Sequence, residues 1–300
     1  KLVSGFNCAA VLGRAARVYM LMGNHDLQYE DSMYEIKNDT EEKNKVDRCT
    51  IIEEELKIMD EWKSKETNFI YDQYYTTLGD NTLILFINSI LYTDARDTSL
   101  ECINIHRQRS GLEKLNHIDN IVSWEENNLR EIARGYAESN NIKNIIIAGH
   151  DPIVTWRKDK RKTIHSRGVL FLNEIYNIFP EANKYYLCAD VHQYQKGTVW
   201  LGESEITQYV VGIGGTKCDE ECAPVIPNTD GCMVMDMDMY VDVVETNLRI
   251  RFKLETCVRY FGYLDCKLVP TESDIANLEF NSIRVANCDS THGPLPEAEH

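Results

Sequence analysis

Three short polar segments of this chain, each preceded by an apolar run, contain the residue types that bind divalent metal ions. They are Met-Gly-Asn-His-Asp at residues 22–26, Gly-His-Asp-Pro at residues 149–152 and Asp-Val-His at residues 190–192. Imidazole, carboxylate and amide oxygen atoms together suit ions of intermediate hardness such as Mn, Fe and Zn. If the three segments meet in space, the chemistry that they predict is that of a metal centre.

The apolar runs before these segments predict the strands that would bring them together. Val18–Leu21, Ile145–Ala148 and Tyr185–Ala189 each have the length and composition of a buried strand. The carboxyl ends of parallel strands share one edge of an open α/β sheet, so loops that are distant in sequence converge there. Asp190 and His192 are separated by one residue, a spacing that in a strand places both side chains on one face.

Amphipathic segments between the runs predict helices, and an alternation of helix and strand is typical of parallel sheets. The hydrophobic positions of Ile118–Ser139 recur at helical spacing, and Gly168–Phe179 predicts a second helix before the run at Tyr185. Leu83–Ile87 and Ile90–Tyr92 together predict a central strand.

These residues resemble the motifs of the calcineurin-like metallophosphoesterases, over roughly residues 5–265. That family carries Asp-x-His, Gly-Asp-x-x-Asp, Gly-Asn-His-Asp/Glu, Gly-His and Gly-His-x-His in this order. Residues 23–26 match the third motif and residues 149–150 match the fourth. The fifth is matched in part, because residues 189–192 keep the second histidine but have alanine in place of glycine and Asp190 in place of the first histidine.

The resemblance implies a metal-dependent phosphoric ester hydrolase. Two divalent ions would share a hydroxide that attacks phosphorus in line. The ligands in this chain would be Asn24, His150 and Asp190 for one ion and His192 for the other. Because a carboxylate in place of an imidazole favours harder ions, Mn is favoured among Mn, Fe, Zn and Mg.

Two further residues would act on the substrate according to the same resemblance. His25 would contact the phosphate and protonate the leaving oxygen, and Asp26 would hold the imidazole in the useful tautomer. The substrate would be a phosphomonoester or a phosphodiester. The sequence identifies neither this substrate nor the oligomeric state.

The resemblance also implies an α/β fold in which two mixed β-sheets form a sandwich flanked by helices. Residues 1–285 would form this domain, with a helical insertion at 31–68, and residues 286–300 would form a flexible tail. No aspartate precedes residue 22, so we expect the strands that carry the first two motifs upstream of Lys1. The second sheet would be formed by the strands predicted after residue 206, namely Tyr209–Ile213, Met233–Tyr240, Leu248–Leu254 and Tyr263–Val269.

Composition and charge limit the classes of function. The 300 residues are 43% hydrophobic and 27% charged, with a formal net charge of -16. This balance is typical of a soluble globular protein and argues against a broad nucleic-acid footprint, which needs clustered Lys and Arg. No apolar stretch approaches the ~20 residues of a membrane span. The basic run at residues 157–162 predicts a solvated loop, and the alternative is a clamp for a phosphorylated substrate.

The ten cysteines leave one local question open. Cys218 and Cys222, with Cys232 nearby, fit a zinc or disulfide site, but the sequence has no second close pair beside them. Unpaired thiols in a reducing compartment are the favoured interpretation, and with them a cytoplasmic location. Two other functions stay open, namely a catalytically inactive scaffold of the same fold, which Asp190 supports, and a cysteine-centred zinc protein.

Overall fold

Four parallel strands form the centre of the main sheet in this computed structural model. They are β4 (Thr82–Phe86), β5 (Asn144–Ala148), β8 (Asn183–Cys188) and β10 (Ser204–Val211), and they lie next to one another in the order β10-β8-β5-β4. Every residue of β5 is buried, as expected of a strand covered on both faces. The predicted strands at residues 83, 145 and 185 are therefore confirmed as parallel neighbours.

The description covers a defined part of the chain. The described residues are 18–19, 21, 69–70, 74–93, 100, 104, 113–139, 141–157, 160–212, 237–243, 248–258, 260–269 and 277–287. The predictions on the motif at residues 22–26, on the helical insertion at 31–68 and on Cys218, Cys222 and Cys232 lie outside these residues, as does the tail beyond residue 287.

Antiparallel strands extend this sheet on both sides. β3 (Tyr75–Leu78) pairs with β4, and β9 (Tyr194–Leu201) pairs with β10. β12 (Leu248–Val258) then pairs with β9, and β11 (Met237–Val243) pairs with β12. The expectation of a second sheet is wrong for β10, β11 and β12. The reason is that β9, which the sequence analysis did not predict, offers its outer edge to β12 and continues the first sheet.

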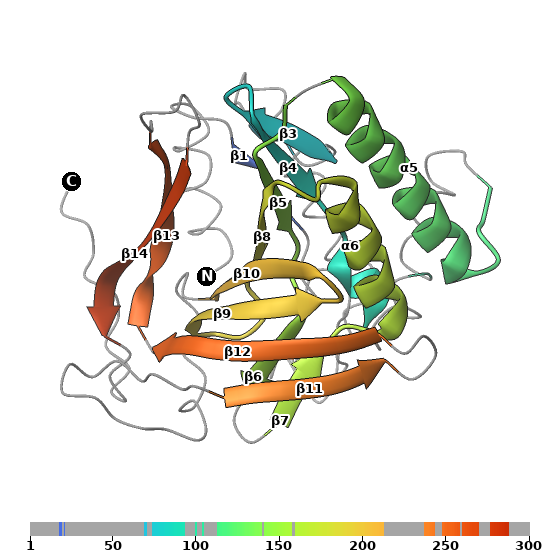
Figure 1. Cartoon of the computed structure of the whole chain (residues 1–300). Helices are drawn as coiled ribbons and strands as arrows, with labels where there is room; N and C mark the ends of the chain where they lie inside the picture. Colours follow the sequence, from blue (N-terminus) through green and yellow to red (C-terminus); the bar gives the residue numbers. More distant parts are fainter. Residues whose placement is uncertain are drawn as a thin grey trace, which may run out of the picture.

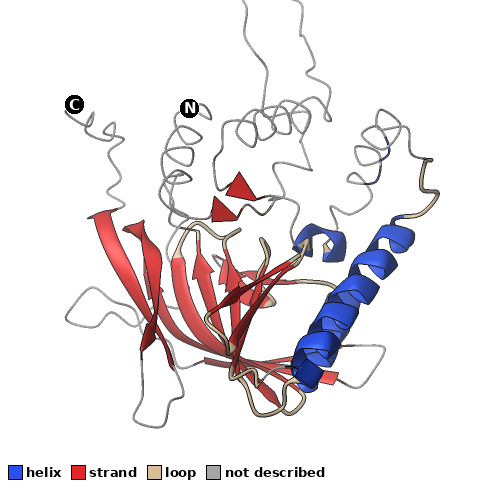
Figure 2. Cartoon of the chain, turned by 90° about the horizontal axis from the view of Figure 1, so that it is seen from above, coloured by secondary structure: helices blue, strands red, loops and turns tan. Residues whose placement is uncertain are grey.

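A two-stranded sheet forms a separate layer. β13 (Tyr260–Val269) and β14 (Asn277–Asn287) form a hairpin that lies on the opposite side of the main sheet from the helices (Figures 1 and 2). The ring of Phe280 on β14 lies 4.9 Å from that of Tyr185 and 4.7 Å from that of Tyr209, measured between centroids. The described residues thus form an α/β fold with one mixed sheet of eight strands and three two-stranded sheets.

Two helices cover the other face of the main sheet. The predicted helix at residues 118–139 is confirmed as α5 (Ile118–Ser139), and α6 (Ser166–Ile178) is the second predicted helix. Their apolar faces join one buried cluster with β4, β5 and β8. The Tyr176 hydroxyl of α6 also donates a hydrogen bond of 2.8 Å to the Tyr185 carbonyl of β8, which fixes the helix on the sheet.

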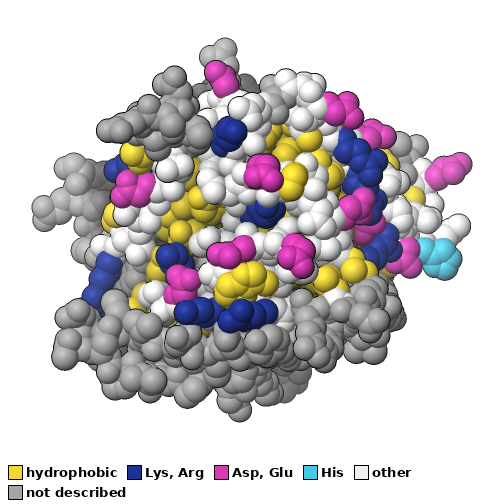
Figure 3. All heavy atoms as spheres, in the orientation of Figure 1, with side chains coloured by type: hydrophobic (Ala, Val, Ile, Leu, Met, Phe, Trp, Pro, Cys, Tyr) yellow, Lys and Arg dark blue, Asp and Glu magenta, His cyan; other side chains and the backbone are white. Residues whose placement is uncertain are grey.

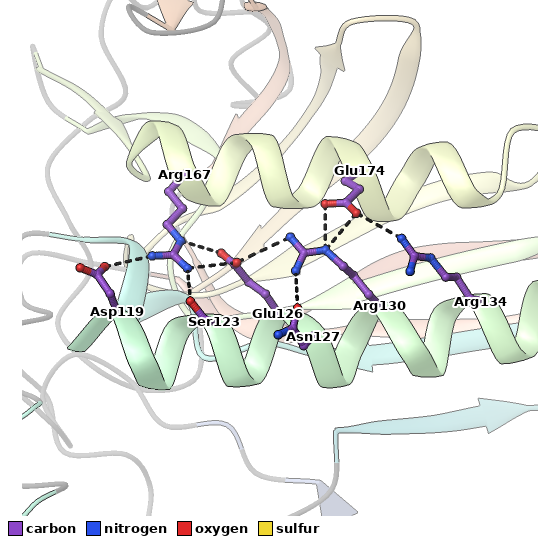
Figure 4. A network of polar contacts seen from close by, with 8 residues as sticks. All are labelled: Asp119, Ser123, Glu126, Asn127, Arg130, Arg134, Arg167 and Glu174. Atoms are coloured by element: carbon purple, nitrogen blue, oxygen red, sulfur yellow. Dashed lines mark hydrogen bonds and ion pairs between the residues drawn. The ribbon is translucent and has the colours of Figure 1, made fainter. Parts of the chain in front are cut away.

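Charged side chains join the two helices along their seam (Figure 4). Arg167 of α6 donates to both carboxylate oxygens of Glu126 on α5, at 2.9 and 3.1 Å. Arg130 of α5 donates in return to both oxygens of Glu174 on α6, each at 2.9 Å. Figure 3 shows basic and acidic side chains interleaved over these helices. Further members of the network are Asp119, Ser123, Asn127 and Arg134.

The chain leaves the main sheet after Ile87. The prediction that Ile90–Tyr92 continues the strand is wrong, because η1 (Ser89–Tyr92) is a single 3-10 turn closed by a bond from the Thr93 amide to the Ile90 carbonyl. The Asn88 amide donates to the Glu125 carboxyl group at 3.0 Å rather than to a neighbouring strand. This side-chain bond redirects the chain and ends the strand.

Residues 157 and 160–162 of the basic run lie in two paired strands rather than in the predicted loop. β6 (Val154–Arg157) pairs with β7 (Lys160–Thr163), with Arg157 opposite Lys160. The buried side chain of Gln208 accepts a bond from the Ile153 amide at 2.9 Å and donates to the Val154 carbonyl at 2.7 Å. The hairpin is therefore fixed to β10 at its base.

A short parallel pair lies beside β3 and β4. β1 (Val18–Tyr19) pairs with β2 (Phe69–Ile70), so the predicted strand at residues 18–21 is confirmed at residues 18–19, in a sheet separate from the main one. The Tyr19 ring stacks on Phe86 with 5.1 Å between centroids, and its hydroxyl lies 2.8 Å from the Thr76 hydroxyl. The strand that precedes Gly23–Asp26 is thus attached near the carboxyl end of β4.

Three described features bear on the remaining expectations. β14 runs through Asn287, past the predicted domain boundary at residue 285. Cys188 and Cys266 are free, but Cys257 is disulfide-bonded, so the expectation of unpaired thiols is wrong at that position. Disulfides are typical of oxidising compartments, and the cytoplasmic expectation loses this support. Among the described helices, none has the length and apolarity needed to cross a membrane.

Replacing Arg167 with Met should lower the free energy of unfolding by about 1–3 kcal/mol, because Glu126, with an 8% exposed side chain, loses its closest cation. Urea denaturation measures this loss. Arg134→Met is the control, since that side chain is 61% exposed and contacts Glu174 only at 3.6 Å, and it should change stability by less than ~0.5 kcal/mol. Equal losses in both variants would contradict the role assigned to the buried Glu126.

Candidate functional site

The polar segments that follow β4, β5 and β8 meet at the carboxyl edge of the main sheet. The amides of Ala189 and Asp190 donate to the carbonyl of His150 at 2.9 and 3.1 Å, and the amide of Gly149 donates to the carbonyl of Leu187 at 3.0 Å. These bonds continue the pairing of β5 with β8 beyond the strand ends. The predicted convergence of the second and third polar segments is therefore confirmed.

The side chains of His150 and Asp190 approach each other at this edge. The Nε2 atom of His150 lies 3.6 Å from Oδ1 of Asp190, and their side chains are 20% and 2% exposed. Protein donors lie about 2.0–2.2 Å from a divalent ion such as Zn²⁺, so two donors of one ion are at most about 4 Å apart. The spacing fits a shared ion, and it also fits a direct contact between a protonated imidazole and a carboxylate.

The hydroxyl group of Ser89 holds the loop that carries His150. It accepts hydrogen bonds from the amides of His150 and Asp151, at 2.9 and 2.7 Å, and donates to the Asp151 carboxylate at 3.1 Å. Ser89 is fully buried and Asp151 is only 2% exposed. Because three bonds converge on one hydroxyl, the path of the backbone at His150 depends on the position of Ser89.

A second hydroxyl group, that of Tyr186, contacts the same loop. Tyr186 on β8 donates to the carbonyl of Asp151 at 2.8 Å and is fully buried. Burial raises the pKa of Tyr186 well above its usual value, so the phenol stays a neutral donor. A Cβ atom at Gly149 would lie 2.9 Å from this hydroxyl oxygen and 3.2 Å from Cβ of Ser89, which explains the absence of a side chain there.

His192 lies in the bend between β8 and β9, because β8 ends at Cys188. The expectation that Asp190 and His192 share one face of a strand is therefore wrong. The amide of Gln193 donates to the carbonyl of Val191 at 2.7 Å, which makes a tight turn around His192. The turn rests on Gly212 at the end of β10, where a Cβ atom would overlap the carbonyl oxygens of Ala189 and Val191.

The first polar segment carries the other three predicted site residues. Asn24, His25 and Asp26 lie outside the described residues. Within the described ranges, no group of three or more His, Cys, Asp or Glu side chains is arranged to hold a metal ion. The part of the candidate site that can be described therefore consists of His150 and Asp190, with His192 on the adjoining turn.

Sequence reasoning missed Ser89, Tyr186 and Gly212. Ser89 follows an apolar run in the same way as the three polar segments, so the signal that singled out His150 was present there too. The contacts of Tyr186 and Gly212 with the site loops depend on neighbouring strands and carry no local signal. An open polar cleft of about 360 Å³, lined in part by Lys184, Glu203 and Glu205, lies at the opposite ends of β8 and β10 and is separate from this site.

Replacing Gly212 with Ala should lower the free energy of unfolding by about 1–3 kcal/mol, because the new methyl group displaces the carbonyl oxygens of the Asp190–His192 turn. Chemical denaturation gives the value. Gly135→Ala is the matched control, since a Cβ atom at that exposed position of α5 meets nothing within 4 Å. It should stabilise the protein by up to about 1 kcal/mol, through helix propensity. A neutral Gly212→Ala variant would show that the turn is not confined by β10.

Comparisons with known proteins add no relative from which a role for these residues could be transferred. No protein-family model matches the chain, and no curated protein matches it. A function is therefore inferred from the described geometry of His150, Asp190 and their supports, together with the motifs of the sequence.

Proposed function

We propose that the protein is a metal-dependent phosphoric ester hydrolase with a fold of the metallophosphoesterase type. The observation that carries the proposal is the 3.6 Å separation of His150 Nε2 and Asp190 Oδ1 at the carboxyl edge of parallel strands. This edge is where open α/β sheets bind ligands. An imidazole and a carboxylate at this spacing have the chemistry and the separation of two ligands of one divalent ion.

Each site residue has a distinct role in this proposal. His150, Asp190 and Asn24 hold one divalent ion, and His192 contributes to a second. When bound, such ions supply Lewis-acid chemistry that activates water and neutralises phosphate oxygens. His25 contacts the phosphate and donates a proton to the leaving oxygen, and Asp26 sets the tautomer of that imidazole.

Asp190 bears on the choice of metal. Its carboxylate is almost fully buried, whereas the imidazole of His150 keeps 20% of its surface exposed. A carboxylate oxygen favours harder ions than imidazole does, so the proposal favours Mn²⁺ over Zn²⁺. The added negative charge also lowers the net charge of the loaded site, which weakens its attraction for a phosphate group.

The same contact supports one alternative. A buried carboxylate 3.6 Å from an imidazole can form an ion pair with protonated histidine and hold the two loops together without any metal. In that case the protein would be a non-catalytic scaffold of the same fold. The cysteine-centred zinc protein has no described geometry in its favour, because Cys218 and Cys222 lie outside the described residues.

The metal-binding part of the proposal is tested by titrating the protein with Mn²⁺ after chelation, with thermal unfolding and Mn²⁺ electron paramagnetic resonance as readouts. We expect Mn²⁺ to raise the melting temperature, because an ion that binds only the folded state stabilises it. His150→Ala should weaken binding on the order of tenfold or more. His117→Ala is the control, since that histidine is exposed and belongs to neither loop of the pair. The scaffold alternative predicts no Mn²⁺ effect in any of the three proteins.

The catalytic part is tested separately by His25→Asn. Hydrolysis of an aryl phosphate monoester and of the matching diester should fall on the order of 100-fold or more with Mn²⁺ affinity unchanged, because general acid catalysis contributes about that much. Steady-state kinetics with saturating Mn²⁺ gives the values. Unchanged turnover in His25→Asn would contradict the role of His25 as proton donor. It would not contradict the proposed metal site.

A further inference from the structure

A buried carboxyl group on α5 contacts the turn that supports the His150 loop. Glu125 is 4% exposed, and its Oε1 atom accepts a hydrogen bond of 3.0 Å from the amide of Asn88. Among the described contacts this is the one hydrogen bond of its side chain, and none of the ion pairs involves it. Its neighbour Glu126, which is 6% exposed, instead takes both Arg167 and Arg130.

Figure 4 shows that Glu126 points into the seam between α5 and α6, where the arginines lie. The groups of like or opposite charge around Glu125 are Glu126 on the same helix, Tyr92 on η1, and Arg167 and Arg130, which are bound to Glu126. Burial, assisted by the charge of Glu126, raises the pKa of Glu125 to about 8, although the Asn88 amide opposes the shift. Glu125 is therefore mostly protonated, and so mostly neutral, at pH values below this pKa.

An unbroken series of direct bonds connects this group to the candidate site. Glu125 binds the Asn88 amide, Ser89 is the next residue, and the Ser89 hydroxyl binds the amides of His150 and Asp151. The His150 carbonyl then binds the amides of Ala189 and Asp190. The Asn88 side-chain oxygen and the Tyr92 hydroxyl, both on this turn, are buried without a hydrogen-bond partner among the described residues.

We propose that Glu125 is a positioning residue that holds the Asn88–Ser89 turn, and through it the His150 loop, only while it is neutral. An ionised Glu125 would be a buried anion beside Glu126 with no cation of its own, and such a group must reach water. Water reaches it when η1 separates from α5, which breaks the bond to Asn88. The result is a loosening of the site in mild alkali that does not require any metal to bind, so the inference goes beyond the proposed function.

The direction of the pH effect follows from the difference in proton binding between the closed and the open state. The pKa of Glu125 is raised from 4.5 to about 8 in the closed state, so the closed state binds more protons than the open state between these values. Opening should therefore become up to about tenfold more frequent per pH unit as the pH rises towards 8, and should level off above it.

The test is hydrogen exchange of the peptide that contains the His150 and Asp151 amides, between pH 5.5 and 8.5, on the full chain without metal. Rates are divided by the intrinsic exchange rate at each pH. In the wild type we expect protection to fall at least tenfold between pH 5.5 and 8, whereas the β13–β14 peptide should show no such fall. Protection that stays flat in the wild type overturns the proposal.

Glu125→Gln and Glu126→Gln form a matched pair of variants. Glutamine at position 125 keeps an oxygen acceptor for Asn88 and cannot ionise, so the pH dependence at His150 should vanish. Glu126→Gln removes the Arg167 and Arg130 pairs and lowers the overall stability, but it should retain the pH dependence, with a lower midpoint. A pH dependence that persists in Glu125→Gln overturns the proposal. If that variant does not fold, the wild-type profile decides alone.

Discussion

The parallel pairing of β5 with β8 is the constraint on which the rest of the site depends. Two runs of apolar residues are buried side by side, and the backbone bonds between them continue past the last residue of each strand. The carbonyl of His150 accepts two amides from the segment of Asp190, so the loops cannot separate without loss of bonds that are shielded from water. This backbone arrangement brings the residues that carry the imidazole and the carboxylate next to each other.

The side chains that support the site are polar and buried, and unlike the apolar core they need hydrogen-bond partners. Ser89 and Tyr186 each end in a hydroxyl group that has a backbone partner on the His150 loop. Hydroxyl groups suit this role because they stay neutral at any pH the protein meets, and they cost little to bury once bonded. Glu125 is the exception, since its contact with Asn88 depends on whether it carries a proton.

The positions of the arginines explain why Glu125 differs from the other supports. Two adjacent carboxyl groups on α5 are both buried, but the arginines along the seam with α6 bind only Glu126. The same seam that fastens the helix to its neighbour thus leaves Glu125 uncompensated. The ion pairs between α5 and α6 and the titratable carboxyl group of Glu125 are therefore two consequences of the same packing of the helices.

The sequence by itself determined the parallel strands at residues 83, 145 and 185, the helix at 118–139 and the meeting of His150 with Asp190, because these follow from apolar runs, periodicity and chain order. It did not determine the path of η1, the hairpin at residues 154–163, or the merging of β10, β11 and β12 into the main sheet. Those depend on partners far away in the chain, namely Glu125 for η1, Gln208 for the hairpin base and β9 for β12. A side-chain bond or a free strand edge leaves no local pattern in the sequence, so only the tertiary structure decides where it acts.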